Sequence, residues 1–445
     1  MQAEFRRTYE LIERTARSLG ARNVEVLMSS QADALTRFAN NAIHQNVYEQ
    51  TRMLSIRVMM DHRTARATTN RIDEAAIRRT VEEAIALTRA VEPDPEMLPL
   101  HEPEPFVDID RFDAATANTT PKQRAEAVRE AIGIVEAASQ TAAGIFSTGE
   151  SVHALFNSQG VSAFHNETEA QFSITAIADD SSGWAKASTV RVSDFDAAAL
   201  ARSARDKAAR SQSPREIEPG RYTVVLEPAA VLDLVGQMFA DFSGTAMADQ
   251  RSFLVDRVGQ PLFGENITIY DDVQHPLQAG AAFDGEGVPR RKLTLVEKGA
   301  PRELAYSRAS AAKAGTTATG HGLPLPNEMG EMPMNIVIAG GDTSLDDIIA
   351  TTARGVLVTR LWYIREVDPY EKIMTGMTRD GTFWIENGEV AYGLRNFRFN
   401  QSLIELLKNV DALSPGVRSS GEEAFDMVVP AMRAREFQFS EVTKF

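Results

Sequence analysis

The stretch from Val224 to Gly244, VVLEPAAVLDLVGQMFADFSG, has a layout on which catalytic groups are often mounted. It predicts a strand, then a proline, then an apolar helix. The later turns of that helix carry Gly236, Gln237 and Asp241, and the stretch contains no histidine. The question is whether this helix carries active-site residues or keeps only the shape of such a helix without its catalytic groups.

Four further side chains in turn-like segments of the second half could do acid–base or metal chemistry. They are His275, Asp284, Glu286 and His321. Asp284 and Glu286 flank a glycine, and paired carboxylates can divide acid and base work between them. Two acids beside glycines more often shape a turn, and we favour that interpretation. Among the seven histidines no two are three to five residues apart, so a zinc-type helix pair is not expected.

The composition excludes several other classes of site. The chain has no cysteine, which rules out disulfides, thiolate metal sites and a cysteine nucleophile. Its 445 residues carry a formal charge of -15 without a cluster of Lys and Arg, so nucleic acid is not an expected partner. No apolar run is long enough to span a membrane, and the amino terminus lacks the apolar core of a signal peptide. We therefore expect a cytoplasmic protein.

The elements that would position these residues fall into two portions. Residues 1–213 predict an N-terminal α/β domain in which two helix–hairpin–helix units, about 1–95 and 118–213, repeat one another. Asp73 and Asp196 each stand where a helix N-cap is expected, at matching places in the two units. A Pro- and Glu-rich connection separates the units.

Residues 214–445 predict a C-terminal domain rich in mostly antiparallel strands. Several β-rich runs are bounded by glycine or acidic turns, and Asn387-Gly388 predicts a tight hairpin. Helices are expected at Pro228 to Ala240 and in the segments SLDDIIATTARG and SLIELLKNV. The expected fold class is therefore α+β, with the candidate helix inside the sheet-rich portion.

The order and spacing of several segments resemble the TldD/PmbA family, also called the TldD/TldE group of peptidase-related proteins. In the first half these segments are TRFANNAIHQN and ATTNRID. In the second half they are FDGEGVPRRKLTLVEKGAPRELAYSRASAAKAG, GDTSLDDIIATTARGVLVTRLW and GTFWIENGEVAYGLRNFRFNQSLIELLKNV. The resemblance covers nearly the whole chain.

The resemblance implies a reading of the candidate helix. TldD-type members are similar to zinc peptidases: their helix carries His-Glu-x-x-x-His and a cysteine far downstream adds a ligand, which leaves one zinc position open for water. TldE-type members keep the helix and lack the ligands. Counted from Pro228, the motif falls on GQMFAD, so Gly236 and Asp241 replace the histidines and Gln237 replaces the glutamate. The chain is thus identified as TldE/PmbA-type, with no catalytic residue and no metal of its own.

The resemblance also implies partners. A TldE-type chain pairs with a TldD-type chain, which supplies the zinc, and the complex degrades unfolded peptides; a homodimer is the other assembly we consider. Two alternatives remain open. One is a self-sufficient hydrolase built from Asp284, Glu286, His275 or His321. The other is a non-enzymatic regulatory protein, as the older family label of a modulator of DNA gyrase suggests.

Overall fold

The computed structural model describes residues 1–443 of the chain. The first half forms the following elements: α1 (Gln2–Ser18), β1 (Asn23–Ala39), β2 (Ala42–Met60), β3 (Arg63–Thr69), α2 (Glu74–Ala90), α3 (Ala114–Ala117), α4 (Pro121–Glu136), β4 (Thr141–Asn157), β5 (Ser162–Ile177), β6 (Ser182–Thr189), the 3₁₀ helix η1 (Val192–Asp194) and α5 (Ala197–Arg210).

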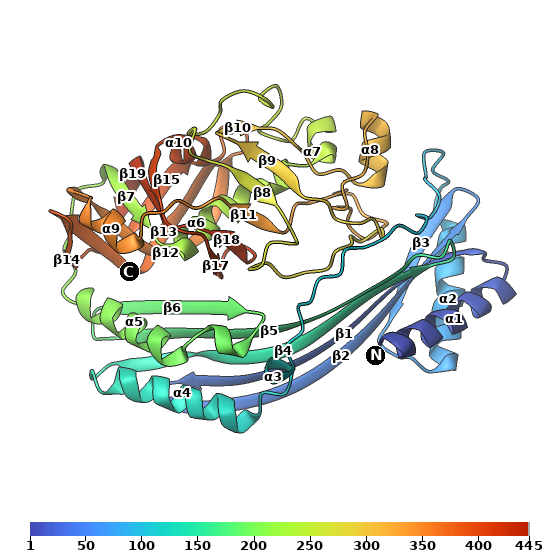
Figure 1. Cartoon of the computed structure of the whole chain (residues 1–445), viewed down its shortest axis with the longest axis horizontal. Coiled ribbons are helices and arrows are strands. Elements are labelled where there is room, and N and C mark those ends of the chain that lie inside the picture. The colour runs from blue at the N-terminus through green and yellow to red at the C-terminus, as the bar shows by residue number, and fades with distance from the viewer. Residues whose placement is uncertain (444–445) are drawn as a thin grey trace.

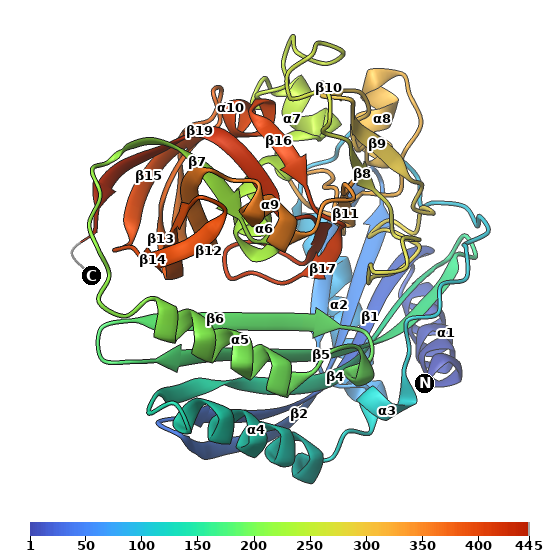
Figure 2. The same cartoon turned by 60° about the vertical axis from the view of Figure 1, so that its left-hand side comes forward.

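The six strands of this half form one sheet in the order β3-β2-β1-β4-β5-β6, and every pairing in it is antiparallel. Each half of the sheet has the element order helix, three strands, helix. Figures 1 and 2 show α4 and α5 over one part of a single face and α1 and α2 at the other end. Two apolar cores lie beneath these two helix pairs.

The N-caps predicted at Asp73 and Asp196 are confirmed. The Asp73 carboxylate accepts from the N–H of Ala76 at 3.0 Å, and the Asp196 carboxylate accepts from the N–H of Ala198 at 2.8 Å. The short apolar run from Asn23 to Met28 is only the first part of β1, which continues to Ala39. In its second part Gln31, Asp33 and Arg37 are exposed, and pairing with β2 on one side and β4 on the other extends the strand beyond the apolar run.

The second half forms these elements: β7 (Gly220–Leu226), α6 (Pro228–Val235), the 3₁₀ helix η2 (Gly236–Asp241), α7 (Gly244–Ala248), β8 (Ile269–Asp271), β9 (Leu293–Glu297), β10 (Ala300–Pro301), α8 (Arg308–Ala314), β11 (Ile336–Ile338), α9 (Leu345–Ala350), β12 (Arg354–Asp368), β13 (Ile373–Glu386), β14 (Glu389–Gly393), β15 (Phe397–Ser402), α10 (Leu403–Lys408), β16 (Val410–Leu413), β17 (Val417–Ser419), β18 (Met427–Val429) and β19 (Met432–Val442).

Two sheets organise this half. The larger has the order β12-β7-β19-β15-β13-β14, and the pairing of β12 with β13 closes its first five strands into a ring. The smaller has the order β10-β9-β8-β11-β18-β17. Most pairings are antiparallel; the parallel ones are β12 with β7 and β11 with β18. The chain is thus a mixed α+β protein, as the sequence predicts.

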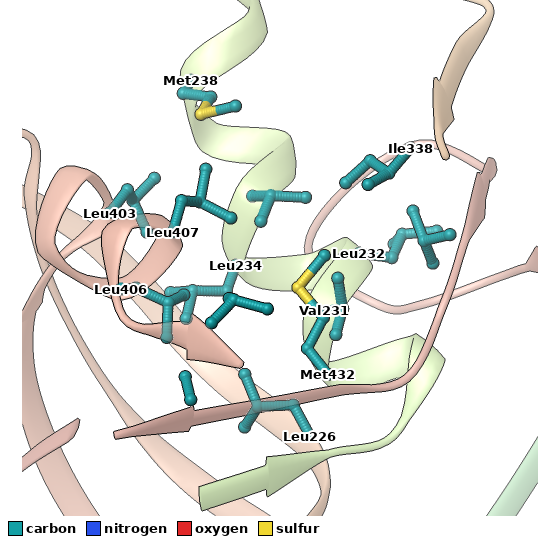
Figure 3. Close-up of a cluster of buried hydrophobic side chains, with 14 of the residues drawn as sticks. Leu226, Val231, Leu232, Leu234, Met238, Ile338, Leu403, Leu406, Leu407 and Met432 are labelled. Atoms are coloured by element: carbon teal, nitrogen blue, oxygen red, sulfur yellow. The ribbon is translucent and has the colours of Figure 1, made fainter. Parts of the chain in front are cut away.

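The candidate helix α6 lies in the largest apolar core of the molecule. Figure 3 shows Leu234 of α6 facing the leucines of α10, and Val231 and Leu232 beside Met432 of β19 and Ile338 of β11. All the apolar residues of α6 from Ala230 to Val235 are completely buried. The helix is therefore held on every side, and its position is fixed by packing.

Candidate functional site

The segment that follows β7 begins as an α-helix and changes its geometry before it ends. Pro228 occupies the first turn of α6, where its missing N–H costs nothing. The α-helix ends at Val235, and residues from Gly236 to Asp241 form a 3₁₀ helix. The prediction of a continuous helix from Pro228 to Ala240 is therefore wrong for its last part. Glycine at position 236 favours this change, because it is a weak former of α-helix.

The first motif position has no room for a ligand. A Cβ atom built on Gly236 would lie 2.4 Å from Cβ of Ala424 and 3.0 Å from Cε of Met427. The side chain of Gln237 is also engaged, since its Nε2 donates to the carbonyl oxygens of Asp233 and Glu423, each at 3.1 Å. The loop between β17 and β18 thus covers this part of the helix.

The last motif position is occupied by an ion pair. Asp241 is 8% exposed, and its Oδ2 lies 2.5 Å from Nζ of Lys372. Lys372 also pairs with Glu366 at 2.6 Å. Burial raises the pKa of Asp241, and the charge of Lys372 opposes that rise. An ammonium group therefore neutralises the carboxylate that a metal ion would need.

The three motif positions do not fit a zinc ion. Gly236 offers no donor atom, Gln237 offers a neutral amide, and Asp241 is held by Lys372. At three residues per turn, positions 236 and 241 are about 120° apart around the helix axis. Within residues 1–443 no group of three or more His, Asp or Glu side chains has an arrangement that could hold a metal ion.

Asp233 is a buried carboxylate in α6 that the sequence interpretation missed. It is 0% exposed, and its Oδ1 accepts from the N–H groups of Glu422 and Glu423 at 2.9 and 2.8 Å. Its Oδ2 has no hydrogen-bond partner among the described residues. Burial raises its pKa to about 6, although the two N–H groups lower it. The available signal was a single charge inside the apolar run PAAVLDLV.

His321 is completely buried and acts as a structural group. Its Nε2 lies 3.0 Å from Oδ1 of Asp271, and its Nδ1 lies 2.9 Å from Oγ1 of Thr319. Burial alone would raise the pKa of Asp271, but the contact with His321 brings it below the usual value. The other oxygen of Asp271 accepts from the N–H of Asn335 at 2.9 Å. The pair ties β8 to the segment before β11.

Asp284 and Glu286 are buried in the loop between β8 and β9. Asp284 accepts from the N–H groups of Glu286 and Val288, both at 2.9 Å, and of Gly322 at 2.7 Å, so it shapes this turn. Glu286 accepts from the N–H of Arg308 at 3.1 Å. Burial, with the nearby charge of Asp284, raises the pKa of Glu286 to about 7.

His275 lies apart from the other three candidates. It lines a pocket of about 270 Å³ together with Tyr270, Asp272 and Lys292, and none of Asp284, Glu286 and His321 lines that pocket. Its Nδ1 accepts from the N–H of Leu277 at 3.3 Å. The structure therefore does not gather the four candidates of the second half into one site.

The chain is similar to known proteins over most of its length. Models of the PmbA/TldA metallopeptidase family match the chain three times: domain 1 at residues 24–88, the central domain at 115–212 and the C-terminal domain at 219–441. The protein named metalloprotease PmbA from Escherichia coli O157:H7 is 24% identical over 399 residues, which cover 85% of each chain.

Solved structures share the fold over almost the whole length. The crystal structure of TldE from Thermococcus kodakarensis superposes with a TM-score of 0.87 at 22% identity, over 97% of this chain and 100% of that chain. A Thermotoga maritima protein described as a candidate modulator of a DNA gyrase also gives 0.87, at 18% identity, over 98% and 100%. In the described part of the chain, no helix has both the length and the apolar character needed to cross a membrane.

Proposed function

The chain belongs to the PmbA/TldA metallopeptidase family, and on that premise we propose that it is a TldE/PmbA-type subunit without a metal centre of its own. In this proposal a TldD-type chain supplies the zinc and the attacking water, and the two chains together cleave unfolded peptides. This chain completes the chamber and helps to hold an extended peptide, for which main-chain hydrogen bonding to an edge strand is the least sequence-dependent means.

One observation gives this proposal its main support: other side chains already fill the space beside residue 236, the first motif position. Ala424 occupies the space that a side chain at position 236 would need, so the loop packs closely against Gly236. If a zinc ligand had been lost by a single substitution alone, empty space for its side chain would remain beside the helix. Here the loop, the amide of Gln237 and the Asp241–Lys372 pair all occupy the region, which supports a stable non-catalytic role.

The experiment is to purify the chain with and without a TldD-type partner and to assay cleavage of an unfolded peptide. We expect cleavage only with the partner, and we expect a zinc chelator to abolish it. A partner whose motif glutamate is replaced by glutamine is the matched control, because it keeps the assembly and removes the base. Chelator-sensitive cleavage by this chain alone would refute the proposal.

Neither alternative has a comparable observation behind it. A self-sufficient hydrolase would need its acid and base at an accessible pocket, but Asp284, Glu286 and His321 are buried and hydrogen-bonded or paired inside the fold, and His275 lines a different pocket. For a non-enzymatic regulatory protein, the formal charge of -15 leaves room for a protein partner but argues against direct binding to DNA, and no described feature identifies such a partner. The gyrase description belongs to the Thermotoga protein.

A further inference from the structure

A second pocket lies where the two halves of the chain meet, and neither the motif helix nor the four candidates line it. Its volume is about 240 Å³. Its walls come from the end of β6, the segment before α3, the turn after β8 and the strand β17. Figures 1 and 2 both show β17 beside the end of β6. A pocket of this size accepts a small molecule or one residue of a peptide.

Three arginines from three segments line this pocket: Arg111, Arg191 and Arg418. Burial lowers the pKa of Arg111; Glu167 opposes this effect, and Arg418 and Arg191 lower the pKa further. The like charges are therefore close enough to repel one another. Such a grouping is costly unless an anion joins it, and guanidinium groups match carboxylates in shape.

Two of the three guanidinium groups retain unused capacity to bind. Among the described residues, Arg111 donates to the carbonyl oxygens of Val273 and His275, at 3.2 and 2.9 Å, and to no others. Arg191 is exposed, and its side chain makes no hydrogen bond or ion pair with residues 1–443. Arg418 differs, because Asp426 lies 3.1 Å from it. Thus neither Arg111 nor Arg191 forms a contact ion pair within residues 1–443, although the charges of Glu167 and Asp110 act on Arg111 and that of Arg191 acts on Asp113.

The two carboxylates in the wall do not contact these arginines directly, although the charge of Asp110 acts on Arg111. Asp110 accepts from the N–H of Phe112 at 3.1 Å, and Asp194 accepts from Oγ of Ser193 at 3.2 Å. Neither forms an ion pair with an arginine of the pocket in the described part of the chain. The pocket therefore keeps guanidinium N–H groups that have no acceptor among the described residues, including the buried Nε of Arg111, beside two carboxylates that retain their charge.

The rest of the wall is apolar. Leu277 and Val417 are 43% and 44% exposed, which is high for such side chains, and Pro276 and Val190 lie beside them. We propose that this pocket binds the C-terminal residue of a peptide, with its α-carboxylate on Arg111 and Arg191 and an aliphatic side chain against Leu277 and Val417.

An adjoining pocket of about 130 Å³ indicates where the other end of the peptide lies. The two pockets share Thr189, Val190 and Arg418. The adjoining pocket is lined by four carboxylates: Asp33, Glu150, Glu167 and Glu169. Burial raises the pKa of both Asp33 and Glu169, whereas for Glu167 burial is outweighed by the contacts with His165 and the N–H of Gly280, which bring its pKa below the usual value. Next to an arginine pocket this arrangement favours a free ammonium group, and the ligand class is a short peptide with both ends charged.

The test uses the full-length chain and the dipeptide alanyl-leucine in titration calorimetry. The C-terminal amide of the dipeptide lacks only the negative charge, and we expect it to bind at least about tenfold more weakly, as loss of a charge-assisted contact implies. The N-acetylated dipeptide lacks the positive charge and carries an added acetyl group, and it should bind a few-fold more weakly. Alanyl-glycine tests the apolar wall and should also bind more weakly.

Variants locate the binding. Arg191→Gln should weaken alanyl-leucine about tenfold and should remove the preference for the acid over the amide. Arg202→Gln is the matched control, because Arg202 is also exposed on the same half and pairs only with Asp196. Leu277→Asp should abolish binding. Because Arg191 and Leu277 are exposed, thermal melting should show that the variants stay folded.

The proposal is overturned if alanyl-leucine does not bind, if acid and amide bind equally, or if Arg191→Gln matches Arg202→Gln. It does not rest on the proposed function, since it needs neither a partner chain nor zinc. A chain that binds the dipeptide and also cleaves peptides alone would support this pocket and refute the non-catalytic role.

Discussion

Lys372 determines the charge balance around Asp241, the last of the three aligned positions. Its ammonium group lies between Asp241 and Glu366, and its side chain is 5% exposed. Asp241 is nearly as well buried, whereas Glu366 is 40% exposed and can turn to solvent. The pair with Asp241 is therefore the part of this cluster that removal of the lysine would leave without compensation.

We predict that Lys372→Met lowers the free energy of unfolding by about 2–4 kcal/mol at pH 7, because a buried carboxylate loses its cation. The loss should shrink at pH 4, where the raised pKa of Asp241 lets that group become neutral. Urea denaturation measures both values. Adding Asp241→Leu should recover most of the loss. Arg251→Met breaks the exposed pair with Asp249 and should change stability by less than about 1 kcal/mol.

Asp233 should make stability depend on pH in the opposite sense from a salt-bridged acid. Its pKa is about 6 in the folded chain against 3.8 as the reference, so the folded state binds more protons between these values. Stability contributed by this group is present at pH 4 and is lost as the pH rises through 6. The loss amounts to about 2–3 kcal/mol.

Asp233→Asn isolates this effect, because the amide oxygen can still accept from the two loop N–H groups. Relative to the wild type, the variant should gain about 2–3 kcal/mol of stability between pH 4 and pH 6.5. The difference between the two unfolding curves cancels the titration of every other group. A difference that stays constant with pH would show that Asp233 is not perturbed in the fold.

At the scale of elements, the close packing of η2 against the loop after β17 supports the non-catalytic interpretation. We predict that Gly236→Ala costs about 1–3 kcal/mol of unfolding free energy, since the new methyl group overlaps Ala424. Ala424→Gly should rescue most of this loss in the double variant, and urea denaturation of the two single variants and the double variant gives the coupling energy. Simple additivity would mean that the two residues are not in contact.

The sequence predicts those features whose pattern lies within a few neighbouring residues. The caps at Asp73 and Asp196 and the hairpin at Asn387-Gly388 follow from rules that span a few residues, and all three form. The length of β1 and the end of α6 depend on distant partners. Lys372 is 131 residues from Asp241, and Ala424 is farther from Gly236 still, so no local pattern could join them.

At the scale of the whole molecule, several contacts tie the two halves together. Ser182 donates to Asp380 at 2.5 Å, Lys186 donates to the carbonyl oxygen of Gly421 at 2.7 Å, and Arg66 donates to that of Leu325 at 2.7 Å. The outer edge of β2 differs, because within residues 1–443 the stretch 42–53 has no strand partner other than β1. Tyr48 on this edge is 68% exposed. A long open edge invites pairing with another chain.

We therefore predict that the protein assembles into a dimer, either with itself or with a TldD-type chain. An obligate interface commonly buries more than about 2,000 Å² in total. Sedimentation velocity at micromolar concentration, with and without the partner, measures the assembly. Purely monomeric protein under both conditions would contradict this prediction.

The measurement that tests the central claim most directly is the zinc content of the purified, tag-free chain. Gly236, Gln237 and Asp241 offer no set of ligands, so elemental analysis should find well below one zinc per chain after dialysis. The same preparation of a TldD-type partner should retain about one zinc per chain, which serves as the positive control. One tightly held zinc per molecule of this chain would contradict the account, because it would reveal a metal site that the structure does not contain at the motif helix.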